Sequence, residues 1–219
     1  MSCMFTMDMR GKTINKTNKI QREKSKLLSV AARLIRRHSY EVVTIRNICR
    51  EADISIGGFY RYFAGKDDLL TSYVSECFTL YLKKKQGAAG LSNPRNEIIN
   101  TMVYFADYFQ SMGLEFVSNY FSPKNQSLNM ISVQNMESQR QVVDYFLTQF
   151  QALREQGMIG KNCDVQELFE ELNVIIDGSV FHWCLKKGAY DLPAVVKKMC
   201  TSYLNLYLEP GYTFKDAPL

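Results

Sequence analysis

Apolar residues recur at helical spacing through most of this chain, and no segment shows the strict alternation that is typical of a strand. The pattern predicts a first helix from about residue 22 to 38, a second from 44 to 52 and a third that begins at 55. A longer helix should follow residue 65. Further helices should cover about 98–112, 142–153, 165–187 and 192–208, with a weaker signal at 114–121. The sequence therefore predicts an all-α fold.

Caps and breakers mark the ends of several predicted helices. Thr44 and Ser55 are good N-cap residues, because their hydroxyls can accept hydrogen bonds from free backbone N–H groups. Gly157 and Gly188 follow apolar stripes and should stop two of the later helices. Residues 86–94 contain Gly, Ser, Asn and Pro and form the clearest break in the chain. We place a domain boundary there.

Charge is distributed unevenly along the chain. Residues 1–66 contain 14 Lys or Arg against 5 Asp or Glu, whereas the remaining residues contain 13 against 17. A basic amino-terminal part on a mildly acidic body suggests that only the first part meets a polyanion. On charge alone, a solvated basic face is an equally good interpretation.

Cysteine and histidine usage gives no sign of a metal or cofactor. The six cysteines are scattered without a paired spacing, and we interpret them as reduced thiols of a cytoplasmic protein rather than redox sensors. His182 is one of only two histidines, so we expect no metal site there. The amino terminus lacks the apolar run of a signal peptide, and no stretch approaches the ~20 apolar residues of a membrane span. We expect a soluble protein with no membrane partner.

Residues 44–66 have the organisation of a helix-turn-helix, in which a second short helix reads the DNA major groove. Gly57 and Gly58 would let its backbone approach the duplex closely, at about 1 kcal/mol of helix stability each. A frayed loop is the alternative. Tyr62 could equally be a packing residue. The candidate DNA-contacting residues are Thr44, Arg46, Ser55, Ile56, Gly57, Gly58, Tyr60, Arg61, Tyr62 and Lys66.

The same region resembles a known family. Residues 24–74 are similar to the amino-terminal domain of TetR-type transcriptional regulators through a Leu- and Ala-rich first helix and a series of short motifs. The matching motifs are Thr44-Ile45-Arg46-Asn47-Ile48, Ala52-Asp53-Ile54-Ser55, Gly57, Phe59-Tyr60-Arg61-Tyr62-Phe63, Lys66-Asp67 and Leu69-Leu70.

The resemblance implies a dimeric protein with a three-helix DNA-binding domain and a variable all-α effector domain. It implies phosphate contacts by Thr44, Tyr60, Tyr62 and Lys66, and groove contacts by Arg46 and residues 55–58. This chain departs from the family at Asp53, where Gly is common, at Gly58, where Thr, Ala or Ser is common, and at Ala64-Gly65. We therefore infer no operator sequence from the resemblance.

These observations divide the chain into four parts. Residues 1–20 are expected to form a disordered basic arm, and residues 21–66 a helix-turn-helix DNA-binding domain. Residues 67–86 should form a connecting helix. Residues 87–219 should form a helical domain for ligand binding and dimerisation.

Aromatic and methionine side chains accumulate in that last domain, which is consistent with an apolar effector pocket. Aromatic stripes at helical spacing are, however, more often core than pocket. Asn173 and Asp177 lie four residues apart among apolar residues, and we favour a structural or interface role for them over contact with an effector. The tentative pocket residues are Met102, Phe105, Phe109, Phe116, Tyr120, Phe146, Phe150, Asn173 and Asp177.

The last two predicted helices, about 165–187 and 192–208, are apolar on more than one face. In a monomer this would leave an exposed apolar patch, so we expect a homodimer that packs these helices as a two-fold four-helix bundle. Two recognition helices would then meet successive turns of a palindromic operator.

Three functions are open at this point. The sequence favours a ligand-responsive repressor that binds double-stranded operator DNA and is released by a small apolar or aromatic effector. A constitutive or protein-regulated DNA-binding dimer, or an activator, is the alternative. An enzyme is disfavoured, because no nucleophile elbow, phosphate loop, metal spacing or histidine-bearing acid–base pair is present.

Overall fold

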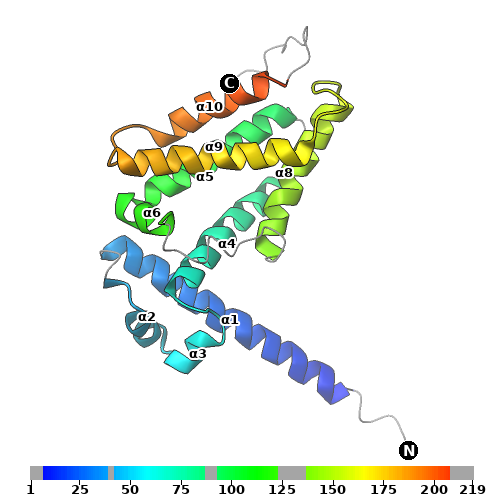
Figure 1. Cartoon of the computed structure of the whole chain (residues 1–219). Helices are drawn as coiled ribbons and strands as arrows, with labels where there is room; N and C mark the ends of the chain where they lie inside the picture. The colour runs from blue at the N-terminus through cyan, green and yellow to red at the C-terminus, as the bar shows by residue number, and fades with distance from the viewer. Residues whose placement is uncertain (1–6, 39–41, 87–92, 123–136, 208–219) are drawn as a thin grey trace, which may run out of the picture. The chain divides into compact units, whose positions relative to one another are not determined.

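The computed structural model describes residues 7–38, 42–86, 93–122 and 137–207. The described residues form α-helices and no β-strand, so the predicted all-α fold is confirmed (Figure 1). The helices are α1 (Met7–Arg37), α2 (Ile45–Ala52), α3 (Ile56–Tyr60), α4 (Lys66–Gln86), α5 (Pro94–Met112), α6 (Leu114–Tyr120), α8 (Glu137–Glu155), α9 (Val165–Leu185) and α10 (Leu192–Asn205).

The chain divides into two compact units, Met1–Val74 and Ser75–Leu219, with the boundary inside α4. In the first unit α1 packs against α2, and α2 packs against α3. The apolar face of α1 supplies the centre of this unit, since Leu27 and Ala31 are fully buried. Ile48 from α2 and Phe59 from α3 complete it. Burial of these side chains holds three helices that are individually too short, or too polar at one end, to be stable alone.

The first helix begins earlier than the sequence predicted. It starts at Met7, whereas residues 1–20 were expected to be a disordered arm. Nothing in residues 12–26 breaks a helix, because this stretch has no Pro or Gly. Once the buried turns after Leu27 have formed, each added residue gains a backbone hydrogen bond at little cost, and the helix extends into the polar segment. Residues 1–6 lie outside the described residues.

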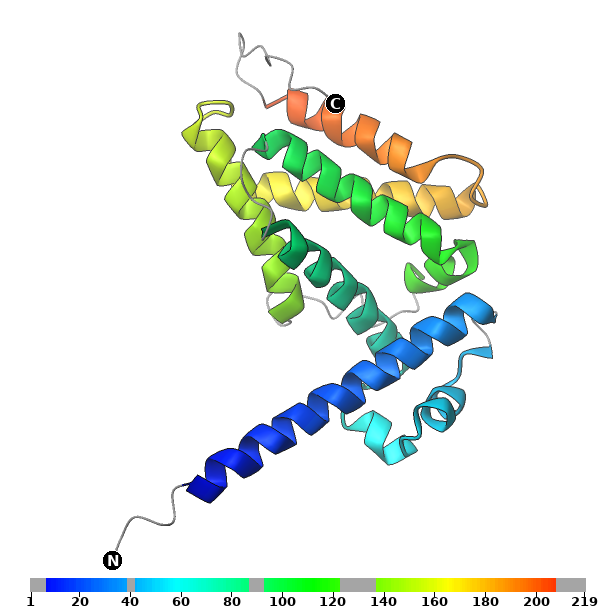
Figure 2. The ribbon, with the colours of Figure 1, turned by 180° about the vertical axis from the view of Figure 1, so that it is seen from behind.

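The second unit is built around α5, which packs against α8, α9 and α10. Helices α9 and α10 lie side by side in both views (Figures 1 and 2). The start of α5 is set by Asn93, whose side chain accepts a hydrogen bond from the Arg95 N–H, and by Pro94 in the first turn. Proline is favourable there because the first N–H groups of a helix have no partner within it. The sequence pattern had placed Pro94 in the breaker.

Positive φ angles end the helices at the predicted glycines. Gly157 and Gly188 both adopt left-handed backbone conformations directly after helices. The weakly predicted helix at 114–121 is present as α6, after Gly113 at φ 84°. The sequence signal is weakest over residues 113–129, and the part of this segment after residue 122 lies outside the described residues.

Candidate nucleic-acid interface

A tight turn joins α2 to α3 and fixes the two helices relative to each other. Asp53 adopts a left-handed conformation, with φ 51° and ψ 48°, and its N–H donates to the carbonyls of Arg50 and Cys49. The Ile54 N–H also donates to the Cys49 carbonyl, at 3.0 Å. These bonds satisfy carbonyls that the end of α2 would otherwise leave without partners.

Side-chain caps start both helices at the predicted residues. The Thr44 hydroxyl accepts a hydrogen bond from the Asn47 N–H at 3.2 Å at the start of α2. The Ser55 hydroxyl accepts one from the Gly58 N–H at 3.0 Å at the start of α3. Ser55 therefore has a structural role in addition to any contact with a ligand.

One face of α2 and α3 is buried and the opposite face is open to solvent. Phe59 and Phe63 are buried and pack at a centroid distance of 5.6 Å, which orients α3. The side chain of Tyr60 is 55% exposed, although its ring meets that of Phe59 edge-on. Seven of the predicted DNA-contacting residues are exposed. They are Thr44, Arg46, Ser55, Ile56, Gly57, Tyr60 and Arg61.

The two glycines of α3 have different physical roles. A Cβ atom on Gly57 would have no neighbour within 4 Å, so this backbone is open to a ligand. A Cβ on Gly58 would lie 2.8 Å from Ile54 Cγ2 and 3.2 Å from the Ser55 hydroxyl. Gly58 is buried, so its small size is required by packing within the unit, and not by an open surface as the sequence suggested.

Tyr62 is half-buried and its hydroxyl donates to the Glu23 carboxylate at 2.5 Å. This hydrogen bond raises the pKa of Tyr62 above its ordinary value, because it favours the protonated phenol. The Arg61 guanidinium lies 3.8 Å from the same carboxylate. Glu23 is thus a functional candidate that sequence patterns missed, since nothing local indicates a contact across 39 residues.

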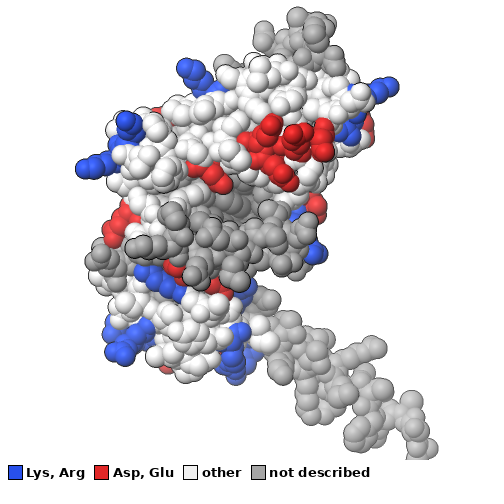
Figure 3. All heavy atoms as spheres, in the orientation of Figure 1, with Lys and Arg blue, Asp and Glu red and all other residues white. Residues whose placement is uncertain are grey.

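Thr44 is exposed and Lys66 is half-buried at the first position of α4. A second ion pair, Arg33 to Glu51 at 2.8 Å, braces α1 against α2. Space-filling views show Lys and Arg side chains around the amino-terminal unit, and an acidic patch on α9 of the other unit (Figure 3). The arrangement offers exposed hydroxyls, guanidinium groups and a close-approach glycine to a polyanion.

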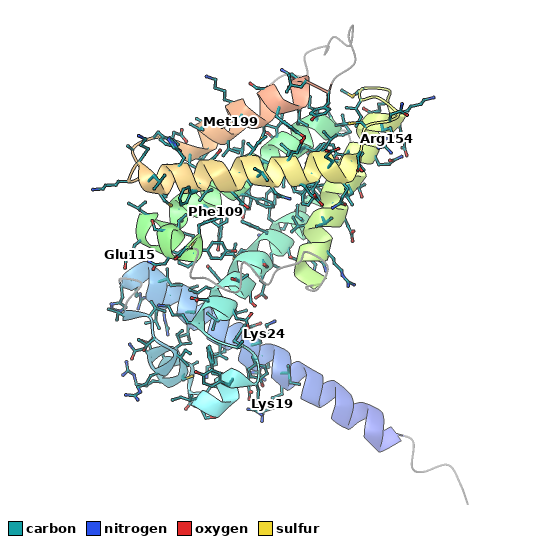
Figure 4. All side chains as sticks on the ribbon, in the orientation of Figure 1. Lys19, Lys24, Phe109, Glu115, Arg154 and Met199 are labelled. Carbon is teal, nitrogen blue, oxygen red and sulfur yellow. The ribbon has the colours of Figure 1, made fainter. Side chains whose placement is uncertain are left out.

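The aromatic residues of the second unit form a packed cluster. Phe105 meets Phe146 at 6.2 Å, and Phe109, labelled in Figure 4, meets Tyr120 at 5.8 Å. Phe78 of α4 stacks on Phe105 at 3.9 Å and joins this cluster, although it was not among the predicted pocket residues. All seven apolar pocket candidates are buried. They are Met102, Phe105, Phe109, Phe116, Tyr120, Phe146 and Phe150.

The two polar pocket candidates do not belong to the interior. Asn173 is half-buried and Asp177 is exposed on the single chain. The apolar residues around them in sequence are divided between two faces of α9, so sequence proximity did not imply burial. Nearby protein atoms nevertheless remove part of the hydration of Asp177 and raise the pKa of its carboxyl to about 6.

A group of polar residues, of which only Tyr145 is buried, lies beside the aromatic cluster. Lys85 of α4 forms an ion pair with Glu97 of α5 at 2.7 Å, and the Tyr145 hydroxyl of α8 donates to Glu97 at 2.9 Å. Burial raises the pKa of Tyr145 well above its usual range. Tyr81 and Tyr104 stack at 3.6 Å. These contacts join three helices of the second unit.

No cluster of three or more His, Cys, Asp or Glu side chains suited to a metal ion occurs among the described residues. The His182 imidazole Nδ1 lies 3.1 Å from the Tyr190 hydroxyl. Within the same described part of the chain, no helix is both long enough and apolar enough to span a bilayer.

Comparison with known proteins places this geometry in context. Residues 27–73 match the family described as "Bacterial regulatory proteins, tetR family". The HTH-type transcriptional regulator HbdR of Aromatoleum sp. (strain CIB) is 30% identical over 76 residues, which are 34% of this chain and 33% of the relative. The match thus spans about a third of that relative's length.

Solved structures share the fold over most of the chain. The fatty acid degradation regulator FadR from Bacillus halodurans has a TM-score of 0.59 at 18% identity, covering 83% of this chain and 94% of that one. FadR from Thermus thermophilus, a repressor in complex with lauroyl-CoA, has a TM-score of 0.65 at 18% identity, covering 90% and 98%. At these identities the likeness concerns the fold.

Proposed function

Because residues 27–73 match the tetR family of bacterial regulatory proteins, we propose that the chain is a transcriptional regulator of this family, and that it is a ligand-responsive repressor that binds a palindromic operator as a homodimer. The observation that carries the DNA-binding part is the exposed face of α2 and α3. There Tyr60 and Arg46 stand free of the core, while Phe59 and Phe63 anchor the helix behind them. Ser55, Ile56 and Gly57 form the part of α3 that enters the major groove.

Phosphate contacts come from the hydroxyls and cations at the rim of this surface. Thr44, Tyr60, Arg61 and Lys66 provide them, and Tyr62 can join only if its hydroxyl leaves Glu23. Gly58 contributes indirectly, by letting α3 pack close to Ile54.

Dimerisation is proposed through α9 and α10. Val174, Phe181 and Leu185 are 72%, 50% and 63% exposed, and with Gly178 they recur at steps of four, three and four along α9. We call these four residues the α9 apolar row. Exposed Met199, labelled in Figure 4, and Leu206 extend the apolar surface onto α10. Pairing two copies would bury this surface. A dimer that reads two successive major grooves needs recognition helices about 34–36 Å apart.

The effector is proposed to enter the second unit among its aromatic side chains. The Lys85–Glu97–Tyr145 group would supply polar contacts beside them. The complex of the Thermus thermophilus relative with lauroyl-CoA makes acyl-CoA thioesters the first class to test. The effector would release the protein from DNA if it binds more tightly to a conformation that fits the operator poorly.

A second candidate is a DNA-binding dimer without a small-molecule effector. The observation in its favour is the close packing of the aromatic cluster, in which Phe78 and Phe105 stack at 3.9 Å. In this case the aromatic residues belong to the hydrophobic core, and DNA binding would be regulated by a protein partner or by the abundance of the regulator itself.

Selection of duplexes from a random pool with the purified protein tests the proposal, followed by binding measurements at moderate salt. We expect a palindromic site, and we expect Tyr60→Ala and Arg46→Ala each to weaken binding about tenfold, as loss of one good contact costs roughly 1–3 kcal/mol. Lys161→Ala, in the second unit, is the matched control. Failure to enrich any duplex would overturn DNA binding.

Acyl-CoA thioesters of graded chain length, and small aromatic acids, are then added to the complex. Release by one class, together with thermal stabilisation of the free protein, supports a ligand-responsive repressor. Neither effect across the panel favours the second candidate.

A further inference from the structure

The first turns of α1 are positively charged, and their residues are not part of the DNA-contacting surface proposed for α2 and α3. Residues 7–26 contain seven Lys or Arg against two acidic residues. Among the described side chains of α1, the buried ones begin at Leu27, so this segment precedes the core contacts of the helix. Twenty helical residues extend about 30 Å, and Figure 2 shows this dark blue part of α1 running past α2 and α3.

Four of these cations share one stripe of the helix. Lys12, Lys16, Lys19 and Arg22 recur at steps of four, three and three, which keeps them on one side of α1. We call them the α1 basic row. Lys19 and Arg22 are exposed, and the Lys19 side chain is 78% exposed. Figure 4 shows Lys19 on α1 near α3.

The row is continuous with the recognition surface through Glu23. Its carboxylate lies 3.9 Å from the Lys19 ammonium and 3.8 Å from the Arg61 guanidinium, and it accepts the hydrogen bond of Tyr62. The carboxy-terminal end of the row therefore adjoins the end of α3. A polyanion seated on α3 and passing Arg61 would next meet Lys19.

We propose that the α1 basic row binds the sugar–phosphate backbone of the DNA that flanks each operator half-site. This inference rests on the proposed function, and it adds a second contact surface to it. The ten helical steps from Lys12 to Arg22 span about 15 Å, close to four or five phosphate steps of about 3.4 Å along one strand. The contact is to phosphate and does not discriminate between base sequences.

The charge pattern favours DNA over other partners. The row is basic, its described members Lys19 and Arg22 are exposed, and its carboxy-terminal end lies beside Arg61. A lipid surface would require an apolar face along the same helix stripe. Lys12, Lys16, Lys19 and Arg22 provide only cations.

The test compares two duplexes that carry the same selected operator. The short one ends at the outer edges of the half-sites, and the long one adds about eight base pairs of arbitrary sequence on each side. Affinity is measured across a range of salt concentrations for the full-length wild type, a Lys12→Gln/Lys16→Gln/Lys19→Gln variant and a Lys83→Gln/Lys84→Gln/Lys161→Gln control. The control removes the same charge from exposed sites in the second unit.

We expect the wild type to bind the long duplex at least tenfold more tightly than the short one. Its salt dependence on the long duplex should be steeper by up to about seven, since four cations on each of two subunits each contribute a slope of about 0.9. The row variant should lose this preference and still bind the short duplex, which shows that it is folded. The control should keep the preference, and changing the flanking sequence should leave it unaltered.

Equal wild-type affinity and salt slope on the two duplexes would overturn the inference and leave the proposed function intact. Retention of the length preference by the row variant would also overturn it. Absence of wild-type binding to every selected duplex would overturn both the inference and the proposed function.

Discussion

The hydroxyl of Tyr62 donates a hydrogen bond to the carboxylate of Glu23 at 2.5 Å, joining the end of the recognition helix to α1. The phenol proton of Tyr62 is therefore already engaged in a hydrogen bond within the protein. Tyr62 can donate to a DNA phosphate only by giving up this bond, whereas Tyr60, exposed one residue before Arg61, has no such constraint from Glu23. The two tyrosines of this motif should respond differently to removal of their hydroxyls.

Replacing Glu23 by Gln, or Tyr62 by Phe, should each lower the free energy of unfolding by about 0.5–1.5 kcal/mol, as expected for one hydrogen bond. The pKa of Tyr62 is raised in the folded protein, so this stabilisation is complete below the unfolded pKa of about 10 and is lost as pH rises through the folded pKa. Urea unfolding at pH 8 and above pH 10 measures the difference. Strict additivity of the two substitutions in a double-mutant cycle would contradict the coupling.

The adjacent glycines of α3 give a matched pair of substitutions. Gly58→Ala should destabilise the protein by about 1–3 kcal/mol, because its Cβ would meet Ile54 Cγ2 at 2.8 Å. Gly57→Ala should raise stability by about 0.5–1 kcal/mol, since its Cβ meets nothing and alanine favours the helix. Gly57→Ala should nevertheless weaken operator binding. Thermal unfolding of both variants measures the effect on packing inside the protein, and DNA titration measures the effect on the approach of the α3 backbone to DNA. Equal stabilities of the two variants would refute the different roles assigned to Gly57 and Gly58.

Asp53→Gly should stabilise the turn between α2 and α3 by up to about 1 kcal/mol, because glycine adopts the observed left-handed backbone without strain. Asp53→Ala should have the opposite effect. Chemical unfolding of the two variants provides the comparison. A more stable alanine variant would mean that this turn is not the source of strain.

Charge placed in the α9 apolar row should separate the proposed dimer. Phe181→Glu is expected to weaken self-association by at least about a hundredfold, as burying an unpaired carboxylate costs several kcal/mol. The monomer should stay folded, because Phe181 is half exposed on the single chain. Analytical ultracentrifugation measures association, and Lys161→Glu is the control. An unchanged dimer would place the interface elsewhere.

Asp177 should make the stability of the chain depend on pH. It is one residue before Gly178 of the α9 apolar row, and desolvation in the single chain raises the pKa of its carboxyl from an ordinary value of 3.8 to about 6. The contribution of the protonated form to the free energy of unfolding is complete below pH 3.8 and is lost as pH rises through 6. Asp177→Asn should therefore raise the free energy of unfolding at pH 7.5 and have a smaller effect at pH 4.5. Urea unfolding at the two pH values measures the difference, and an equal effect at both would rule out titration of this group.

Local chemistry made the amino-terminal unit predictable. Thr44 and Ser55 cap the helices at which the sequence placed them, and apolar spacing predicted the helices of this unit. Longer-range contacts were not predictable in this way. Gly58 is small because of Ile54, and that contact depends on the path of the turn through Asp53.

The second unit was predictable as helices but not as a site. Periodicity assigns residues to faces of a helix, but it does not say which apolar face is core when two exist. On α9 one face holds Leu172 and Val180 in the interior while the other exposes Val174 and Phe181, so apolar neighbours in sequence did not show that Asp177 lies on the exposed face of the single chain. Phe78 was missed as a neighbour of Phe105 because they come from different helices.

If the α9 apolar row is the dimer interface, as proposed, the number of chains in a cell directly influences regulation. In the proposed homodimer only the paired form spans two half-sites, so when most chains are unpaired, halving their concentration reduces the paired form about fourfold. Operator occupancy would then respond to gene dosage and dilution at cell growth more steeply than a single binding step allows. The apolar side chains on α9 would set the chain concentration at which pairing begins.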